Sequence, residues 1–197
     1  MADFPESVQA FVFKNRGTLL ALPAVLLALT GKPARGSARA GISLAIAGEL
    51  LRCWAVGYSG VTTRGSKVEA PELVSAGPYA YVRNPLYVGN FITAAGFAIA
   101  FTGGLRPGRR IATIAASLVV MAGVYATIVP HEEQFLLGEF GPDFERYREN
   151  VPPLFPRTTP WDEGRGTWRP EVIRSAETRT FVTFAAMLTA LAFKTRT

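Results

Sequence analysis

Residues 84–130 read NPLYVGNFITAAGFAIAFTGGL-RPGRR-IATIAASLVVMAGVYATIVP, and this stretch decides the fold. Asn84 to Leu105 holds no charged residue over 22 positions, and Ile111 to Pro130 holds none over 20. A helix needs about 20 apolar residues to cross the hydrocarbon core of a membrane, so each part is long enough to span it. The basic connection at 106–110 is short, which predicts a tight membrane hairpin with spans at 85–105 and 110–130.

Other apolar stretches predict further membrane helices. We expect spans at 8–31 and 40–63, although the first also resembles a cleaved signal peptide that ends near Ala38-Arg39-Ala40. Near the C-terminus, Thr180 to Phe193 is uncharged over only 14 residues, which is short for a span. We therefore expect residues 172–193 to form either a tilted fifth span or an interfacial helix.

The composition supports a membrane protein. Charged residues make up 18% of the chain, against roughly 25% in soluble domains. The net charge is +6, and the basic residues cluster between apolar stretches, which favours contact with membrane lipid over nucleic acid. A single Cys53 and a single His131 argue against a metal site. We predict an all-α, polytopic membrane bundle of four to five transmembrane helices, forming one domain over 1–197.

Two polar regions, 64–83 and 131–179, fall on the same side of the membrane as the N-terminus in this arrangement. That side carries 12 Lys and Arg residues against 8 on the other side, so the positive-inside rule favours the cytoplasm. We expect a cytoplasmic pocket formed by loop 64–84 and the amphipathic segment 131–156. Small residues such as Gly41 permit close packing within or between chains, and the oligomeric state stays open.

The segment Gly77–Tyr87, GPYAYVRNPLY, contains the first candidate site. Gly77-Pro78 indicates a turn, and Pro85 suits the first turn of a helix with Asn84 as its N-cap. Arg83 beside a helix N-terminus would make a receptor for a carboxylate. The alternative is that Arg83 is a snorkelling membrane anchor.

The segment 130–151 contains the second candidate site. An apolar stripe at helical spacing predicts amphipathic helices, and Gly141-Pro142 divides it into two short ones; the stripe comprises Leu136, Phe140, Phe144, Tyr147 and Val151. Glu132 and Glu133 stand at the end of the fourth span. They are either solvated, or one binds ribose hydroxyls while the other faces a cationic centre.

Two charged residues lie within the second span. Glu49 and Arg52 are three positions apart and therefore share one helix face. Charges inside a span usually face the bundle interior, so we expect Arg52 to have a role in a site or in packing.

Together these segments resemble the isoprenylcysteine carboxyl methyltransferase and phospholipid methyltransferase family of bacterial-type integral membrane enzymes. The resemblance covers roughly Leu50 to Pro156. The matching motifs are GPYAYVRNPLY from Gly77, the Glu132–Glu133 pair, FGPDFERY from Phe140 and VPPLFP from Val151.

The resemblance implies S-adenosylmethionine as the cofactor and a lipophilic methyl acceptor that enters from the membrane. It implies a bacterial inner-membrane protein with the site facing the cytoplasm, Arg83 and Glu133 as catalytic residues, and isoprenylcysteine carboxyl O-methylation as the favoured reaction. A carboxylate acceptor needs no general base, whereas a protonated amine would need one, for which Glu133 is the candidate. The cofactor-binding residues implied are Leu73, Val74, Gly77, Tyr79, Arg83, Asn84, Tyr87, Glu132 and Glu133.

The sequence departs from the family pattern mainly in the half expected to bind the acceptor. Asn84 stands in place of the commoner His, Ile128 in place of a frequent Arg, Pro71 in place of a frequent His, and Phe144 in place of a Tyr. Three alternatives therefore stay open: a phospholipid N-methyltransferase, a membrane reductase of related architecture using a nicotinamide cofactor, and a membrane protein without catalytic activity. The region 157–197 has no counterpart in the pattern.

Overall fold

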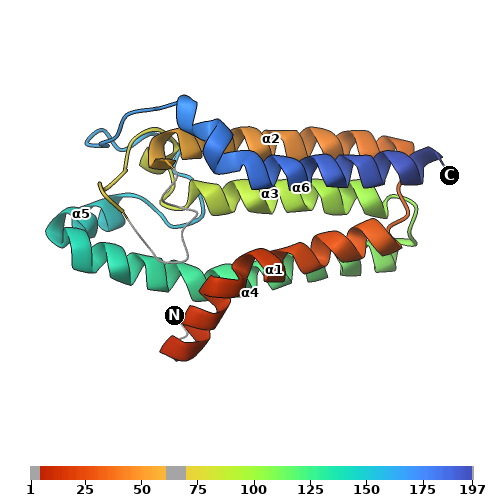
Figure 1. The fold of residues 1–197 in the computed structure, drawn as a ribbon, viewed down its shortest axis with the longest axis horizontal. Helices are drawn as coiled ribbons and strands as arrows, with labels where there is room; N and C mark the ends of the chain where they lie inside the picture. The colour runs from red at the N-terminus through yellow and green to blue at the C-terminus, as the bar shows by residue number, and fades with distance from the viewer. Residues whose placement is uncertain (1–4, 61–69, 197) are drawn as a thin grey trace. The chain divides into compact units, whose positions relative to one another are not determined.

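The computed structural model describes residues 5–60 and 70–196, and every regular element in them is a helix, which confirms the all-α prediction (Figure 1). The elements are α1 (Glu6–Thr30), α2 (Arg35–Ser59), the 3-10 helix η2 (Gly77–Ala80), α3 (Pro85–Thr102), α4 (Pro107–Phe140), α5 (Pro142–Asn150) and α6 (Glu171–Arg196).

Four helices in the described ranges, α1 to α4, are long and apolar enough to cross a membrane. They correspond to the four predicted spans. α2 begins at Arg35 instead of residue 40 and ends at Ser59, while residues 61–63 of the predicted span lie outside the described residues. α6 is a continuous helix of 26 residues and contributes Met187 and Leu191 to the core that contains Leu27, Ala45 and Phe101. The choice between a fifth span and an interfacial helix stays a prediction.

The end of α4 was predicted wrongly. We expected the fourth span to stop at Pro130 and a separate amphipathic helix to follow, but α4 continues through Pro130, Glu132 and Glu133 to Phe140. Proline inside a helix costs about 3 kcal/mol, yet residues 131–140 are mostly strong helix formers, which favours continuation. The predicted break at Gly141-Pro142 is confirmed, because Gly141 has φ +49° and α5 begins at Pro142.

The helices contribute to two compact units. The first comprises Met1–Glu49, Asn90–Ile128 and Arg179–Thr197, and the second comprises Leu50–Gly89 and Val129–Thr178. The prediction of one domain over 1–197 stays a prediction.

Apolar packing holds the first unit together. Its core includes Leu27 of α1, Ala45 of α2, Phe101 of α3 and Leu191 of α6. α2 and α3 approach closely where Gly96 lies against the α2 backbone: a Cβ at Gly96 would stand 2.5 Å from the Ala45 nitrogen. Small residues at such a crossing let two membrane helices pack backbone against backbone.

A smaller apolar core holds the second unit together. Phe144, Tyr147 and Val151 are buried, and Leu73, Leu136 and Trp161 are among the half-buried residues packed against them. Phe144, where the family pattern has Tyr, is 1% exposed in this cluster, so an apolar ring suits the position. All the candidate cofactor residues lie in this unit.

Candidate functional site

The predicted turn at Gly77-Pro78 is confirmed. It forms η2, and Gly77 has φ +61°, a conformation that favours glycine. A Cβ at Gly77 would also meet the ring of Tyr58. The turn directs the chain into Tyr79, whose carbonyl accepts a hydrogen bond from the Tyr147 hydroxyl at 2.8 Å.

Arg83 joins three segments of the second unit. Its Nε and Nη2 atoms donate to Oε1 of Glu133 at 2.9 and 2.8 Å. Its Nη1 atom donates to the carbonyl oxygens of Arg148 at 2.7 Å and Val151 at 2.8 Å. The side chains of Arg83 and Glu133 are only 10% and 15% exposed, so this ion pair is largely removed from water. The guanidinium thus faces protein acceptors, an arrangement unlike that of a snorkelling anchor.

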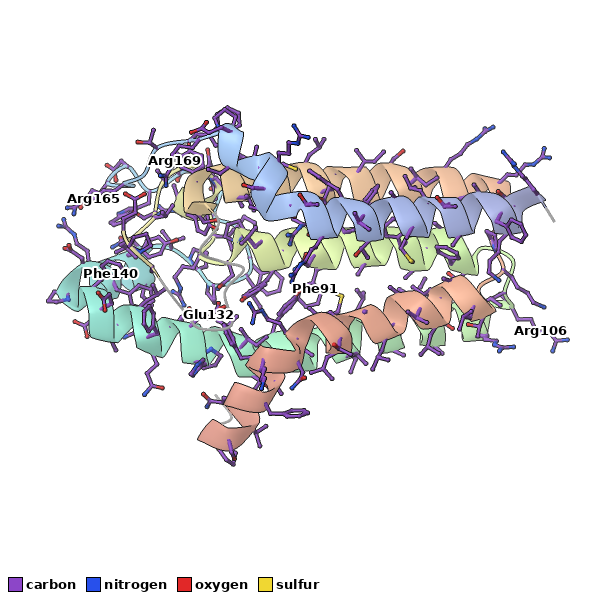
Figure 2. The ribbon with its side chains drawn as sticks, viewed as in Figure 1. Phe91, Arg106, Glu132, Phe140, Arg165 and Arg169 are labelled. Carbon is purple, nitrogen blue, oxygen red and sulfur yellow. The ribbon has the colours of Figure 1, made fainter. Side chains whose placement is uncertain are left out.

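Glu132 meets the first turn of α3. The Tyr87 hydroxyl donates to its carboxylate, with the two oxygen atoms at 2.7 and 2.8 Å. Glu132 projects from the part of α4 that continues beyond Pro130 (Figure 2). This hydrogen bond fixes the carboxylate of Glu132 relative to the first turn of α3.

Asn84 stands at the N-cap position of α3, as predicted from Pro85. Its carbonyl accepts from the backbone N–H groups of Tyr87 and Val88, both at 3.1 Å. The side-chain amide donates to the carbonyl of Pro153 at 3.0 Å. Asn84 therefore connects the start of α3 to the segment that follows α5.

The remaining predicted site residues, Leu73 and Val74, lie on the chain that leads into η2. Leu73 packs against the apolar core of the second unit. Val74 lies beside Gly166, where a Cβ would stand 3.3 Å from its Cγ1 atom. The structure thus brings together Arg83 with Glu133 and Tyr87 with Glu132 by direct hydrogen bonds, and places Leu73, Val74, Gly77, Tyr79 and Asn84 in the same unit. Their roles toward a cofactor stay predictions, as does the pocket, and residues 64–69 of its loop lie outside the described residues.

A buried ion pair was not predicted from the sequence. Arg52 was expected in a site or in packing, and its Nη2 atom binds both carboxylate oxygens of Glu177 at 2.8 and 2.9 Å. Glu177, on α6, is 0% exposed. The only sequence signal was Arg52 itself, since a charge inside a span needs an opposite partner.

Two buried tyrosines predict a specific response to alkaline pH. Burial raises the pKa of Tyr79 to about 12, with a side-chain hydrogen bond to Ser59 opposing the shift. Burial also raises the pKa of Tyr147 well above its usual value. A raised folded-state pKa gives stability that is complete below the unfolded pKa of about 10 and is lost as pH rises toward the folded pKa.

We therefore expect the thermal midpoint in detergent to fall as pH rises above about 10. Tyr147→Phe removes one ionising group and the hydrogen bond to the Tyr79 carbonyl, so it should cost about 1 kcal/mol at neutral pH but flatten the alkaline decline. Circular dichroism melts from pH 8 to 12 measure both effects. An unchanged alkaline slope in the variant would contradict the assignment to Tyr147.

Comparison with known proteins identifies the family of the chain. The family model described as phospholipid methyltransferase matches residues 37–143, more than half of the chain, and the match includes Gly77–Tyr87 and the Glu132–Glu133 pair. No solved structure matches.

Curated relatives resemble part of the chain. The cobalt-zinc-cadmium resistance protein CzcN of Cupriavidus metallidurans is 33% identical over 128 residues, 65% of this chain and 51% of the relative. The protein-S-isoprenylcysteine O-methyltransferase of Schizosaccharomyces pombe is 39% identical over 87 residues, 43% of this chain and 34% of the relative. The nickel-cobalt-cadmium resistance protein NccN of Alcaligenes xylosoxydans xylosoxydans is 34% identical over 89 residues, which are 45% of this chain and 38% of the relative. The matched region thus spans about half or less of the length of these relatives. The family match over residues 37–143 shows that the chain belongs to the phospholipid methyltransferase family.

Proposed function

We propose that this protein is an S-adenosylmethionine-dependent methyltransferase that acts on a lipophilic acceptor in the membrane, with its site facing the cytoplasm of a bacterial cell. The observation that carries the proposal is the interlocked pair of contacts at the start of α3, Arg83 with Glu133 and Tyr87 with Glu132. These four residues belong to the two segments that carry the family motifs, and all four are at least half-buried.

The charges of this group fit the proposed cofactor. S-adenosylmethionine offers a sulfonium, ribose hydroxyls and a carboxylate. Glu132 is half-buried beside the first turn of α3, and a carboxylate is a group that can accept hydrogen bonds from ribose hydroxyls or compensate a positive centre. The N-terminus of α3 supplies the positive potential that a carboxylate needs, and Arg83, bound to Glu133, lies directly before it.

The main task of the protein in this reaction is to position the methyl donor and the acceptor. When bound, the cofactor supplies an activated methyl group, and the protein must align it with the acceptor and exclude water. Such alignment can account for much of the rate of a displacement reaction. The paired contacts hold Glu132 and Glu133 in fixed positions relative to the first turn of α3, which suits that task.

A carboxylate is our first choice of acceptor. It needs no general base, and proton transfer to Glu133 would disrupt the ion pair with Arg83. One relative is named as a protein-S-isoprenylcysteine O-methyltransferase, which agrees with this choice. The second candidate is the amine of a phospholipid headgroup, favoured by Ile128, which is 0% exposed where the family pattern often has an Arg that could hold a carboxylate.

Labelled methyl transfer distinguishes these candidates. The purified full chain in detergent is incubated with tritium-methyl S-adenosylmethionine and either a prenylated cysteine or a phospholipid extract. Methyl esters release labelled methanol in alkali, whereas N-methyl groups keep their label. We expect alkali-labile label on the prenylated acid. Alkali-stable label in the lipid extract would select the second candidate, and no label in either, from folded protein, would count against the proposal.

A further inference from the structure

The segment 157–169, named the strap here, leads from the region after α5 into α6 and lies outside the family match. Its first half is bound to the chain that follows η2. The backbone N–H of Arg157 donates to the carbonyl of Tyr81 at 3.0 Å, and that of Trp161 donates to the carbonyl of Ala80 at 2.9 Å.

The second half of the strap binds the chain that precedes η2. The carbonyl of Arg165 accepts from the backbone N–H groups of Ser75 at 2.8 Å and Ala76 at 2.9 Å. The Arg165 N–H in turn donates to Oγ of Ser75 at 2.9 Å. The strap therefore runs antiparallel to loop 75–81. Its hydrogen-bond partners fall in residue number along the strap, from Tyr81 at position 157 to Ala80 at 161 and Ser75 at 165. Figure 2 shows Arg165 and Arg169 along it.

Close packing fixes the strap in place. A Cβ at Gly164 would stand 2.7 Å from the carbonyl oxygen of Ser75, so the two backbones touch. The ring of Trp161 lies 5.5 Å, centroid to centroid, from that of Tyr147. The indole of Trp168 occupies the space that a Cβ on Gly57 would need. The strap therefore packs against the loop, α5 and α2 within the second unit.

A buried charge pair secures the far end of the strap. The N–H of Arg169 donates to the carbonyl of Gly57 at 2.7 Å, and α6 then brings Glu177 to Arg52. The Nη1 atom of Arg52 also donates to the carbonyl oxygen of Leu86, at a distance of 3.5 Å. Leu86 precedes Tyr87, so the pair connects α6 to the first turn of α3, where Glu132 is bound.

We infer that the strap positions loop 73–81 and that Glu177, acting through Arg52 as a positioning residue, positions the first turn of α3; this inference rests on the proposed function. Loop 73–81 has little regular structure of its own, and the strap supplies partners for its backbone groups. These contacts therefore fix the backbone conformation of the loop. They also fix the positions of its candidate cofactor residues, Leu73, Val74, Gly77 and Tyr79. The C-terminal region is thus part of the cofactor site.

Gly164→Ala tests the strap, with Gly138→Ala as its matched control. The added Cβ would push against the Ser75 carbonyl at position 164, whereas nothing lies within 4 Å of a Cβ at position 138. We expect Gly164→Ala to raise the KM for S-adenosylmethionine about tenfold, with kcat within about threefold, because small displacements of binding groups have large effects. A wild-type KM in folded Gly164→Ala protein would overturn the role of the strap.

Two variants test Glu177. Glu177→Gln removes the negative charge that Arg52 binds in a buried site, which destabilises the fold. The double variant Arg52→Met with Glu177→Met therefore replaces the pair by apolar groups of similar size. We expect the folded double variant to show a raised cofactor KM of about tenfold with kcat little changed. A wild-type KM in that variant would remove Glu177 from the positioning role.

Tryptophan fluorescence gives an independent readout. In a Trp54→Phe background the remaining tryptophans, Trp161 and Trp168, both belong to the strap. Titration with S-adenosylhomocysteine should change their emission saturably, at concentrations that match its binding measured by calorimetry. Binding without an emission change would contradict the inference alone, whereas no binding by the folded parent chain would reject the proposed function and the inference together.

Discussion

Arg83→Met should reduce methyl transfer by at least about a hundredfold and destabilise the second unit by about 3–5 kcal/mol. The variant removes the partner of Glu133 and the donor to the carbonyls of Arg148 and Val151. It leaves a carboxylate that is only 15% exposed without its countercharge. Thermal melts in detergent and labelled methyl transfer measure the two effects.

Two further substitutions make the result for Arg83 specific. Arg83→Lys keeps the positive charge, but a single ammonium cannot reproduce the planar guanidinium that donates to a carboxylate and two carbonyls. The lysine variant should therefore be more stable than Arg83→Met but less stable than the parent chain. Arg148→Met removes an exposed side chain while leaving the carbonyl that Arg83 binds, and it should behave as wild type. If Arg83→Met melted and transferred methyl groups like the parent chain, the ion pair would have no role in the fold or the site.

Glu132→Gln should weaken S-adenosylmethionine binding by about 10- to 100-fold, which corresponds to about 1.4–2.8 kcal/mol. Glutamine keeps an oxygen that can accept from the Tyr87 hydroxyl but has no negative charge. The effect on stability should therefore be small. Equilibrium binding of labelled cofactor, with a melt on the same preparation, separates the two quantities.

The control for Glu132 lies on the same helix. Glu139→Gln removes an exposed carboxylate of α4 and should bind cofactor as the parent chain does. Tyr87→Phe should bind the cofactor with an affinity between those of Glu132→Gln and Glu139→Gln, because it removes the hydroxyl that orients Glu132 but leaves the negative charge of Glu132. Equal affinities for Glu132→Gln and Glu139→Gln would show that the charge of Glu132 is not used.

The membrane helices could be predicted because their signal is local. The uncharged stretches 84–105 and 111–130 are long enough to decide α3 and most of α4 by themselves. The same rule failed at Pro130, since a single proline was given more weight than the ten following residues, most of which are strong helix formers. The glycine at position 141, which adopts positive φ, ended the helix as predicted.

The candidate site was predictable as two segments but not as a set of contacts. The motifs indicated candidate residues, and Arg83 was expected to receive the carboxylate of a ligand. The sequence could not show that Arg83 pairs instead with Glu133, 50 positions away. Glu177 lies 125 positions from Arg52, and no motif in the sequence connects the two residues. The strap binds its loop mainly through backbone groups, which any residue type carries, so no sequence pattern indicated it.

Equilibrium binding of tritium-labelled S-adenosylmethionine to the full chain in detergent tests the central claim most directly. The account predicts saturable binding by the parent chain and by Glu139→Gln, and weaker binding by Glu132→Gln. A parent chain that is folded by circular dichroism yet shows no saturable binding would contradict it.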